Sequence, residues 1–410
     1  MRRTILALVA LGLWSCLGVP GTADWPQWRG PGRDGQAPAV RMPRRWPGEL
    51  RLLFQVEVGE GHASPVVWGD RVLVFTRVGD DEVVRALDSL SGRQVWQDSY
   101  RAPYSEDPAA VAHGKGPKST PTVHEGRVYV HGMSSVLTCY DAATGKIHWR
   151  HDLLQEYMAS GPQYGTAASP LVVGELVVVP VGDQKEGHLM AFDRQNGKVR
   201  WKTPCDGPAY GSPVIGELAG GKQIVTLTRN TLLAVEPGQG RLLWQVRYRT
   251  AYEQNCLTPL LIAGDRVIVS GYMRPTVAYR ITRAGASYRV AEQWQSDRLK
   301  MYMSSPILVQ DHLIGLDQSG KLVCMEARSG AVRWTGGEFG EYASLIHAGG
   351  QVLVCDEGGE LVVLAADPTA YRELARLRLS EEPVWAHLAI VPGRLFVKSR
   401  TRLTAYELPQ

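Results

Sequence analysis

Short runs of alternating apolar and polar residues, separated by turns rich in glycine and aspartate, follow one another along almost the whole chain. The pattern is clearest in residues 120–149, TPTVHEGRVYVHGMSSVLTCYDAATGKIHW. Alternation with a period of two is typical of strands that bury one face, and Asp and Gly suit the turns between them. The stretch therefore predicts a four-stranded sheet, with strands over 120–124, 127–132, 136–140 and a last one that ends on Trp149. One such sheet cannot bury both of its faces, so further copies must stack on it.

Eight copies of this unit begin with the same short signature, a small hydroxyl residue followed by proline, or with a degenerate version of it. Proline is tolerated at the first residue of a strand because its missing N–H need not enter the ladder. The clear starts are Ser64-Pro65, Thr120-Pro121, Ser169-Pro170, Ser212-Pro213, Thr258-Pro259 and Ser305-Pro306, and the degenerate ones are Ser344-Leu345 and His387-Leu388. A hairpin turn follows each start, so the repeat and turn patterns agree.

An aromatic residue ends the fourth strand of most copies. It is a tryptophan at Trp96, Trp149, Trp201, Trp244, Trp294 and Trp334. The last copy reaches only its third strand, and residues 52–58 can supply the fourth, with Phe54 in the aromatic's place. A shared blade of this kind closes a ring and removes exposed sheet edges. The fold class we expect is all-β: an eight-bladed β-propeller of four-stranded antiparallel blades, closed by an N-terminal strand that joins the C-terminal blade.

Copies such as AFDRQNGKVRW and CYDAATGKIHW resemble the tryptophan-docking motif of the pyrroloquinoline-quinone (PQQ) type β-propellers. That family includes quinoprotein alcohol dehydrogenases and the non-catalytic BamB-like proteins of outer-membrane barrel assembly, and this chain is closest in kind to the latter. The resemblance implies that the six tryptophans dock each blade against the next. Residues 24–35, DWPQWRGPGRDG, also resemble the opening of secreted members, so we expect 24–48 to cap the propeller formed by 49–410.

Residues 1–23 have the features of a signal peptide. Arg2 and Arg3 precede an apolar run that is too short for an ordinary membrane span, and small residues precede Asp24. We expect export to the periplasm or cell envelope, with no transmembrane span. The sequence at Cys16 loosely resembles a lipoprotein box, so lipidation there stays open beside soluble export, which we favour. The net charge of +4 falls to +2 without the two arginines, and we expect no nucleic-acid partner.

The cysteines form no recognisable metal or redox motif. Beyond Cys16 there are five, none of them in a CxxC pair, so we expect no metal site. Cys139 and Cys324 occupy the same strand position in different copies and are expected to be small buried residues. Cys205 and Cys256 fall in neighbouring connections between blades, and a disulfide between them stays open.

Candidate binding residues lie in the connections between blades. Such connections emerge on one face of a propeller and converge on the mouth of its central channel. Aromatic rings with polar handles, which suit a peptide, a sugar or a flat ligand, precede several inner strands, at Tyr164, Tyr210, Tyr252, Tyr302, Tyr342 and Trp385. Candidate polar residues of the channel are His62, Lys118 and His387, and the long connection 99–119 adds a mixed-charge flap on the same rim.

No catalytic or cofactor-binding residue emerges from the sequence, and we expect no cofactor. Quinoprotein dehydrogenases of the resembled family need a calcium site and a carboxylate base, whereas the isolated acids here sit in turns or at strand ends, such as Asp183, Glu186, Asp317 and Asp356. The preferred hypothesis is an exported, non-catalytic, monomeric binding scaffold for a protein or cell-envelope component. The alternatives are a PQQ- and calcium-dependent dehydrogenase and a carbohydrate-binding propeller.

Overall fold

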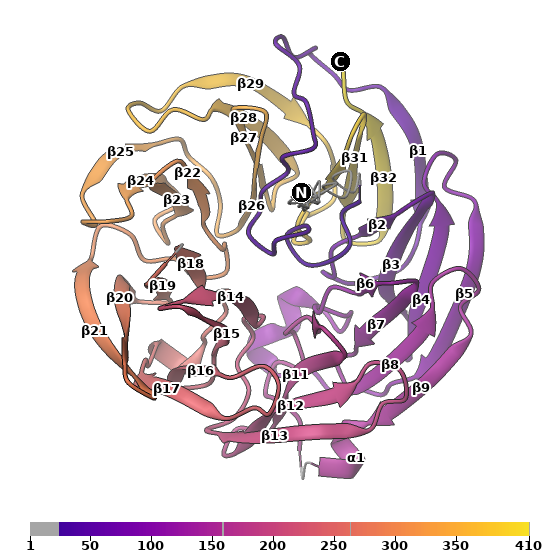
Figure 1. Cartoon of the computed structure of the whole chain (residues 1–410). Helices are drawn as coiled ribbons and strands as arrows, with labels where there is room; N and C mark the ends of the chain where they lie inside the picture. The colour runs from indigo at the N-terminus through magenta and orange to yellow at the C-terminus, as the bar shows by residue number, and fades with distance from the viewer. Residues whose placement is uncertain (1–23, 158–159, 263, 410) are drawn as a thin grey trace, which may run out of the picture.

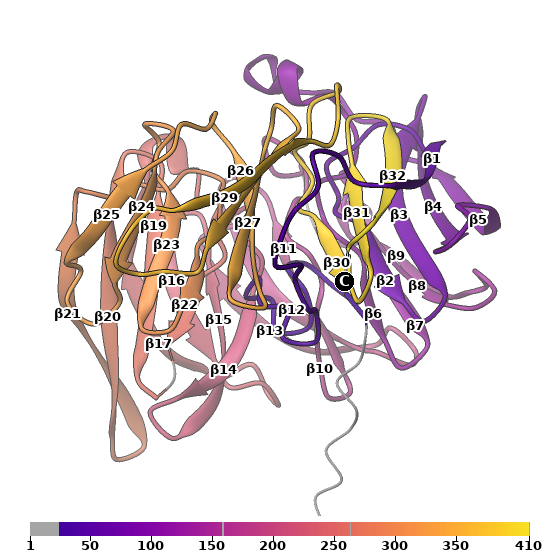
Figure 2. The ribbon, with the colours of Figure 1, turned by 90° about the horizontal axis from the view of Figure 1, so that it is seen from above.

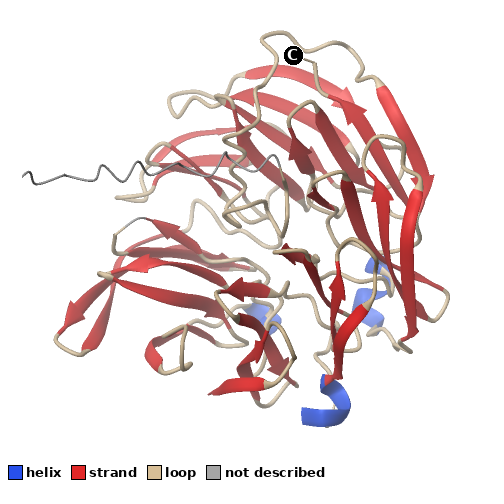
Figure 3. Ribbon diagram, turned by 45° about the vertical axis from the view of Figure 1, so that its right-hand side comes forward, coloured by secondary structure: helices blue, strands red, loops and turns tan. Residues whose placement is uncertain are grey.

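The computed structural model describes residues 24–157, 160–262 and 264–409, so the predicted signal peptide and Cys16 lie outside the described residues. Eight four-stranded antiparallel sheets surround a central axis, and Figure 1 shows the ring that they form. Figure 3 marks the strands in red and the short helical turns in blue. The chain is therefore the eight-bladed, all-β propeller that the repeats predict.

We number the blades in chain order from the first sheet that is complete in sequence. Blades 1 to 4 consist of β2 (Val66–Trp68), β3 (Arg71–Val78), β4 (Asp81–Asp88) and β5 (Gln94–Arg101); β6 (Thr122–His124), β7 (Arg127–His131), β8 (Val136–Asp141) and β9 (Ile147–Asp152); β10 (Leu171–Val173), β11 (Leu176–Gly182), β12 (Gly187–Asp193) and β13 (Val199–Cys205); and β14 (Val214–Leu218), β15 (Gly221–Leu227), β16 (Thr231–Val235) and β17 (Leu242–Arg247).

Blades 5 to 7 follow the same order. They consist of β18 (Leu260–Ile262), β19 (Arg266–Gly271), β20 (Arg274–Ala284) and β21 (Ser287–Ser296); β22 (Ile307–Val309), β23 (His312–Leu316), β24 (Leu322–Glu326) and β25 (Val332–Gly336); and β26 (Ala343–Ala348), β27 (Gln351–Asp356), β28 (Glu360–Ala365) and β29 (Glu373–Arg378). The helical segments are η1 (Pro108–His113), α1 (Leu153–Tyr157) and η2 (Ala251–Glu253). Among the described residues, no helix is long and apolar enough to cross a membrane.

Blade 8 joins the two ends of the chain, as predicted. Its strands are β1 (Leu52–Glu57), β32 (Arg402–Glu407), β31 (Arg394–Lys398) and β30 (Ala389–Val391), with β1 outermost and antiparallel to β32. Phe54 is buried, and a Cβ on Gly92 of blade 1 would lie 2.5 Å from its ring. Phe54 therefore occupies the place that a tryptophan holds in other blades.

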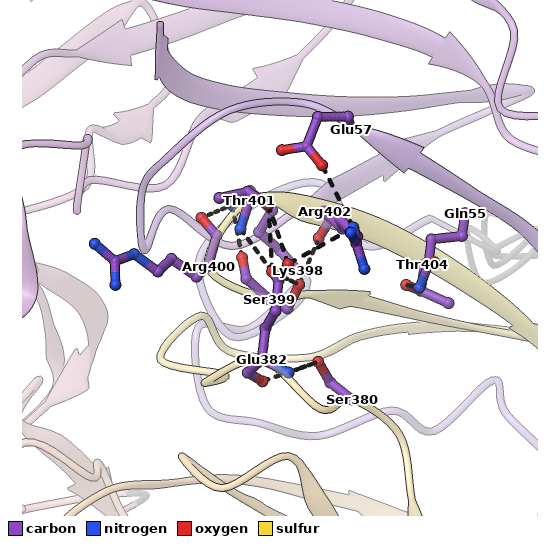
Figure 4. A network of polar contacts seen from close by, with 10 residues as sticks. All are labelled: Gln55, Glu57, Ser380, Glu382, Lys398, Ser399, Arg400, Thr401, Arg402 and Thr404. Carbon is purple, nitrogen blue, oxygen red and sulfur yellow. Dashed lines mark hydrogen bonds and ion pairs between the residues drawn. The ribbon is translucent and has the colours of Figure 1, made fainter. Parts of the chain in front are cut away.

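A network of polar contacts secures this closure (Figure 4). The buried ammonium of Lys398 donates to the carbonyls of Gly61, Ser399 and Arg400 at 3.2, 2.7 and 3.0 Å. Arg402 lies between Glu57 on β1 and Glu382, at 3.4 and 3.6 Å. Because Gly61 lies in the connection that leads from β1 into blade 1, Lys398 joins the last blade to the first through the backbone.

The hydroxyl residue at the start of a blade accepts a hydrogen bond from the neighbouring blade. The N–H donors and hydroxyl acceptors are Ser64 and Thr120 (3.1 Å), Thr120 and Ser169 (2.9 Å), Ser169 and Ser212 (3.0 Å), Thr258 and Ser305 (3.2 Å), and His387 and Ser64 (3.0 Å). In blade 2 the ladder accordingly begins at Thr122, two residues after the predicted start. Pro121 cannot donate to the ladder, so the N–H of Thr120 before it is free to bond to the neighbouring blade.

The tryptophans dock one blade against the next in five of six positions. Their indole N–H groups donate to a carbonyl in the turn of the next blade: Trp96 to Ala142, Trp149 to Arg194, Trp201 to Pro237, Trp294 to Ala327 and Trp334 to Asp367, at 3.0 to 3.3 Å. Trp244 instead donates to Gln223 Oε1 of its own blade at 2.6 Å. The next blade there has the long β20–β21 hairpin, whose turn residue Gly285 has no non-neighbouring atom near its Cβ position.

The five described cysteines are free thiols, and Cys205 and Cys256 do not form the disulfide that sequence analysis left open. Cys139 and Cys324 are fully buried, as expected for small core residues. Cys205 Sγ instead lies 3.9 Å from the carbonyl of Gly207. Burial raises the pKa of the Cys256 thiol to about 12, so this group is neutral at ordinary pH.

The N-terminal segment, which we define as residues 24–48, starts in the middle of the ring and runs out to its edge before β1 (Figure 1), and Figure 2 shows the same ribbon turned by 90°. It enters beside the first hairpin turn, where Asp24 Oδ1 accepts the N–H of Gly69. Buried Arg33 then donates to the carbonyls of Ser169 and Pro170 at 3.0 and 2.9 Å. The segment leaves the channel past Trp46, whose indole N–H donates to Gln351 Oε1 at 2.8 Å. It therefore fills the channel from the face that carries the first hairpin turns.

Candidate functional site

A cavity of about 220 Å³ lies at the opposite mouth of the channel, where the connections between blades converge. We call this cavity the funnel. Five of the six aromatic residues expected on the rim line it, together with two of the three polar candidates. These seven residues are Tyr164, Tyr210, Tyr302, Tyr342, Trp385, His62 and Lys118. The repeat thus places side chains from seven different connections around one space.

The aromatic rings of the funnel pack against one another and form its wall. Tyr342 and Trp385 are stacked with ring centroids 5.6 Å apart, and His113 meets the Trp385 ring edge-on at 4.8 Å. On another side, Tyr164 and Tyr210 are 5.6 Å apart. Offset and edge-on pairs of this kind are favourable and hold each ring in a defined orientation. The wall is therefore an ordered surface of aromatic faces and edges.

Trp28 of the N-terminal segment forms the floor of the funnel. Its indole N–H donates to Thr258 Oγ1 at 3.0 Å, and its ring meets the His387 ring edge-on at 5.5 Å. Thr258 is the blade start whose hydroxyl accepts from Trp28 in place of the N–H of a neighbouring blade. The segment expected to cap the propeller thus contributes a residue to the candidate site itself.

Lys118 brings the positive charge of the lining. Its ammonium donates to the backbone carbonyl of Tyr164 at 3.0 Å, and burial lowers its pKa to about 8. Beside it, His62 Nε2 lies 2.7 Å from the carbonyl of His113, and burial lowers the pKa of His62 to about 3. His62 is therefore neutral at ordinary pH, and Nε2 carries the proton because its neighbour can only accept.

The connection 99–119 folds over one side of the funnel. Its η1 turn begins at Asp107, which accepts the N–H of Ala109 at 2.8 Å, and the other carboxylate oxygen accepts from Gln163 at 2.9 Å. The buried Arg77 side chain donates to the carbonyls of Ala102 and Lys115. These contacts position Ala109, Ala110, His113 and Lys118 on the lining.

Two predicted site residues lie outside the funnel. Tyr252 has a positive φ of 55° in η2, and its side chain is 76% exposed, with Tyr272 between it and Tyr302. His387 is buried beneath the floor, where its ring nitrogens lie 2.9 and 3.2 Å from the carbonyls of Leu388 and Leu345. The local backbone turn carries Tyr252 away from the rim, and Trp28 covers His387.

Several residues of the lining are not among the site residues predicted from the sequence. Gln254 accepts the hydroxyl of Tyr302 at 2.6 Å, and Cys256 lies near Lys118 on the wall. They lie two residues apart in the connection that contains Tyr252, and that spacing could have indicated that they share a side. Trp28 had no such signal, because its place depends on the path of the N-terminal segment through the channel.

The lining does not fit calcium-bound PQQ, which the resembled family suggests as a ligand. Calcium is held by six to eight oxygen ligands, with carboxylates prominent among them. No Asp or Glu belongs to the lining, and the described residues contain no cluster of three His, Cys, Asp or Glu side chains that could hold a metal ion. The Lys118 ammonium also repels a cation placed there.

Comparison with other proteins identifies relatives of two kinds. Outer membrane protein assembly factor BamB of Yersinia pestis is 22% identical over 77% of this chain and 68% of its own length. Quinohemoprotein alcohol dehydrogenase ADH-IIG of Pseudomonas putida is 28% identical, but the match covers 48% of this chain and only 27% of the dehydrogenase. The chain therefore spans about two thirds of the first protein and about a quarter of the second.

Solved structures of both kinds share the fold. BamB from Moraxella catarrhalis superposes with a TM-score of 0.63 at 16% identity, over 87% of this chain and 97% of that one. The ADH-IIG structure from Pseudomonas putida gives 0.66 at 15% identity, over 94% and 80%. Residues 80–336 match the family described as outer membrane protein assembly factor BamB. The chain belongs to this family of PQQ-like β-propellers.

Proposed function

We propose that this protein is an exported, non-catalytic binding scaffold of the cell envelope, and that it holds a protein partner in the funnel. The BamB relatives are named as assembly factors of outer membrane proteins, which supports a role in envelope assembly for this chain. Proteins with this level of sequence similarity share a fold but can bind different partners, so we infer the partner from the chemistry of the site.

The observation that carries the proposal is the aromatic lining of the funnel. Tyrosine and tryptophan are enriched where proteins bind one another, because each ring offers a large contact area and a polar end at a small loss of side-chain freedom. Tyr302, Tyr342 and Trp385 come from three different connections and still meet at one cavity. A surface that is concave, aromatic and ringed by polar groups suits an inserted segment of a partner.

The position of the N-terminal segment agrees with a tethered scaffold. Asp24 lies beside the hairpin turn at Gly69, at the end of the channel away from the funnel. A membrane tether or lipid attached upstream of Asp24 would therefore leave the funnel free for a partner. Soluble export would leave it equally accessible.

Affinity capture from envelope extract of the source cells tests the proposal. The bait is the mature protein, compared with Trp385→Ala in the funnel and with Tyr252→Ala as an exposed aromatic outside it. We expect one partner to be retained by the wild type and by Tyr252→Ala and to be lost with Trp385→Ala. Retention of the same partners at equal yield by all three proteins would contradict the proposal.

A carbohydrate ligand is the second candidate, favoured by the hydroxyls of the tyrosine wall and the amide of Gln254. Glycan-array binding that Tyr210→Ala together with Tyr302→Ala abolishes, at unchanged thermal stability, would support it over a protein partner. The dehydrogenase alternative predicts that purified protein mixed with PQQ and calcium shows a bound-quinone spectrum and reduces a dye with alcohols.

A further inference from the structure

Lys118 is half-buried in the funnel wall, where its ammonium is partly withdrawn from water. Among the described residues its one hydrogen-bond acceptor is the carbonyl of Tyr164 at 3.0 Å, whereas an ammonium carries three N–H donors. No ion pair of Lys118 with a carboxylate occurs among the described residues. The nearby Cys256 thiol is neutral, and Glu106 lies outside the lining. A cation withdrawn from water is costly unless a ligand supplies the missing acceptor.

The rest of the funnel defines what must accompany that acceptor. Besides Lys118 and several smaller polar residues, the lining includes the large aromatic side chains of Tyr210, Tyr302, Tyr342, Trp385 and Trp28. Aromatic walls favour a large apolar or aromatic group. Neither of the two imidazoles near the ammonium, His62 and His113, supplies a negative charge that could pair with Lys118. The lining thus places one cation beside a group of large aromatic rings.

The size of the funnel favours an inserted side chain over a free cofactor-sized molecule. Pockets for small-molecule ligands usually hold about 300–1,000 Å³. The funnel measures about 220 Å³, which is below that range. A space of this size suits one large side chain together with an adjoining charged group.

We propose that the funnel selects a partner segment in which a carboxylate accompanies an aromatic or large aliphatic side chain, and that Lys118 binds the carboxylate. This inference rests on the proposed function and names the chemistry of its partner. The carboxylate is either the C-terminus of the partner or an acidic side chain next to the apolar residue. Both sources present the same pair of oxygens to the ammonium.

Two probes that differ only in charge test the role of Lys118. N-acetyl-L-tryptophan carries the carboxylate, and N-acetyl-L-tryptophanamide replaces it by a neutral amide. Calorimetric titration into the mature protein should show roughly tenfold tighter binding of the carboxylate probe, equivalent to about 1.4 kcal/mol, because a hydrogen bond between two charged groups is stronger than one to a neutral amide. Equal binding of the two probes, or no binding of the carboxylate probe, would overturn the inference.

Substitutions at Lys118 assign the effect to its charge. In Lys118→Met, which keeps the length of the apolar stem, the preference for the carboxylate probe should disappear, whereas Lys118→Arg should retain most of it. Circular dichroism melts verify that each variant is folded; if Lys118→Met is not, Lys118→Gln takes its place. A preference that persists without the charge at 118 contradicts the proposal.

Short peptides separate the two sources of the carboxylate. An acetylated peptide ending in Trp with a free C-terminus is compared with its C-terminal amide and with an amidated peptide in which Asp precedes Trp. Tight binding of the first alone assigns a C-terminus, and tight binding of the third assigns an acidic side chain. Weak binding of all three would contradict the inference.

Affinity capture with Trp385→Ala and with Lys118→Met separates a failure of this inference from a failure of the proposed function. If the captured partner is lost with Trp385→Ala but retained by Lys118→Met at wild-type yield, the funnel binds a partner and the acidic selection is wrong. If Trp385→Ala also retains the partner, the proposed function fails with it.

Discussion

The indole N–H of Trp28 donates to Thr258 Oγ1 at 3.0 Å, a contact between residues 230 positions apart in the sequence. It joins the N-terminal segment to the start of blade 5. Because Trp28 also lines the funnel, the segment that fills the channel from one face completes the candidate site on the other. The binding site and the closure of the channel therefore depend on the same side chain.

Trp28→Ala should reduce binding in the funnel, and Trp46→Ala should not. Both residues are half-buried, both belong to the N-terminal segment, and each donates one side-chain hydrogen bond to the propeller. Only Trp28 lines the cavity. We expect both variants to have a lower Tm and only Trp28→Ala to lose affinity for N-acetyl-L-tryptophan by more than about tenfold. Equal losses of affinity would mean that the floor of the funnel plays no part.

Ser64→Ala should lower the free energy of unfolding by about 1–3 kcal/mol. The buried Ser64 hydroxyl accepts the N–H of His387 at 3.0 Å, so its removal leaves that donor unpaired at the junction of blades 8 and 1. Ser119 is the matched control, because its hydroxyl is equally buried and has no hydrogen-bond partner in the described structure. Ser119→Ala should be neutral or slightly stabilising in urea titrations, and an equal loss for both would contradict the role of the hydroxyls.

Gly145→Ala should destabilise the protein by about 1–3 kcal/mol more than Gly126→Ala. Both glycines have a positive φ, 74° and 72°, so the backbone strain of alanine is similar at the two positions. A Cβ at Gly145 would lie 2.6 Å from the Trp96 ring, whereas one at Gly126 meets nothing within 4 Å. The difference between the two variants in urea titrations therefore measures how tightly blade 1 docks on blade 2. Equal destabilisation would remove the packing argument.

The stability of the protein should depend on His387 in mild acid. Burial, with a smaller effect of Arg29, lowers the pKa of His387 to about 4, against about 6.5 in an unfolded chain. Between these values the unfolded chain binds a proton that the folded protein excludes. The free energy of unfolding therefore falls as the pH falls from 6.5 to 4, by at most about 1.4 kcal/mol per pH unit for this residue, and this contribution levels off below pH 4.

Urea titrations between pH 7 and pH 4 measure this dependence. In His387→Asn the slope of stability against pH should be smaller than in the wild type. The control is the same substitution at His124, a half-buried position on β6, and it should reduce the slope less than His387→Asn does. An identical slope in His387→Asn and the wild type would contradict the assignment.

The repeat made most of the fold predictable from sequence. Ser64 and its counterparts mark the blade starts, and Phe54 in the tryptophan position identifies the closing strand, because both are local patterns that recur in each copy. The departure at Trp244 was not predictable in the same way. Its partner Gln223 replaces a carbonyl of the next blade, and that replacement follows from the unusual length of the β20–β21 hairpin.

The candidate site was predictable only in part. Tyr302 and Trp385 reach the funnel because their connections are set by the propeller geometry. Tyr252 does not, because the backbone turns at two consecutive residues with positive φ, Tyr252 and Glu253, and neither residue type predicts such a turn. Trp28 arrives from a segment outside the repeats, so its position depends on tertiary contacts alone.

A partner bound in the funnel should be captured by site-specific photo-crosslinking in the source cells. The photoreactive residue p-benzoylphenylalanine is placed at Met303, which lines the funnel, or at Ile147 on the exposed outer strand β9. We expect the variant with the photoreactive residue at position 303 to form a discrete covalent adduct with one envelope protein. Adding Trp385→Ala should remove this adduct, and the variant with the photoreactive residue at position 147 should form none. An adduct from 147 without one from 303, or an adduct from 303 that Trp385→Ala leaves unchanged, would contradict binding in the funnel.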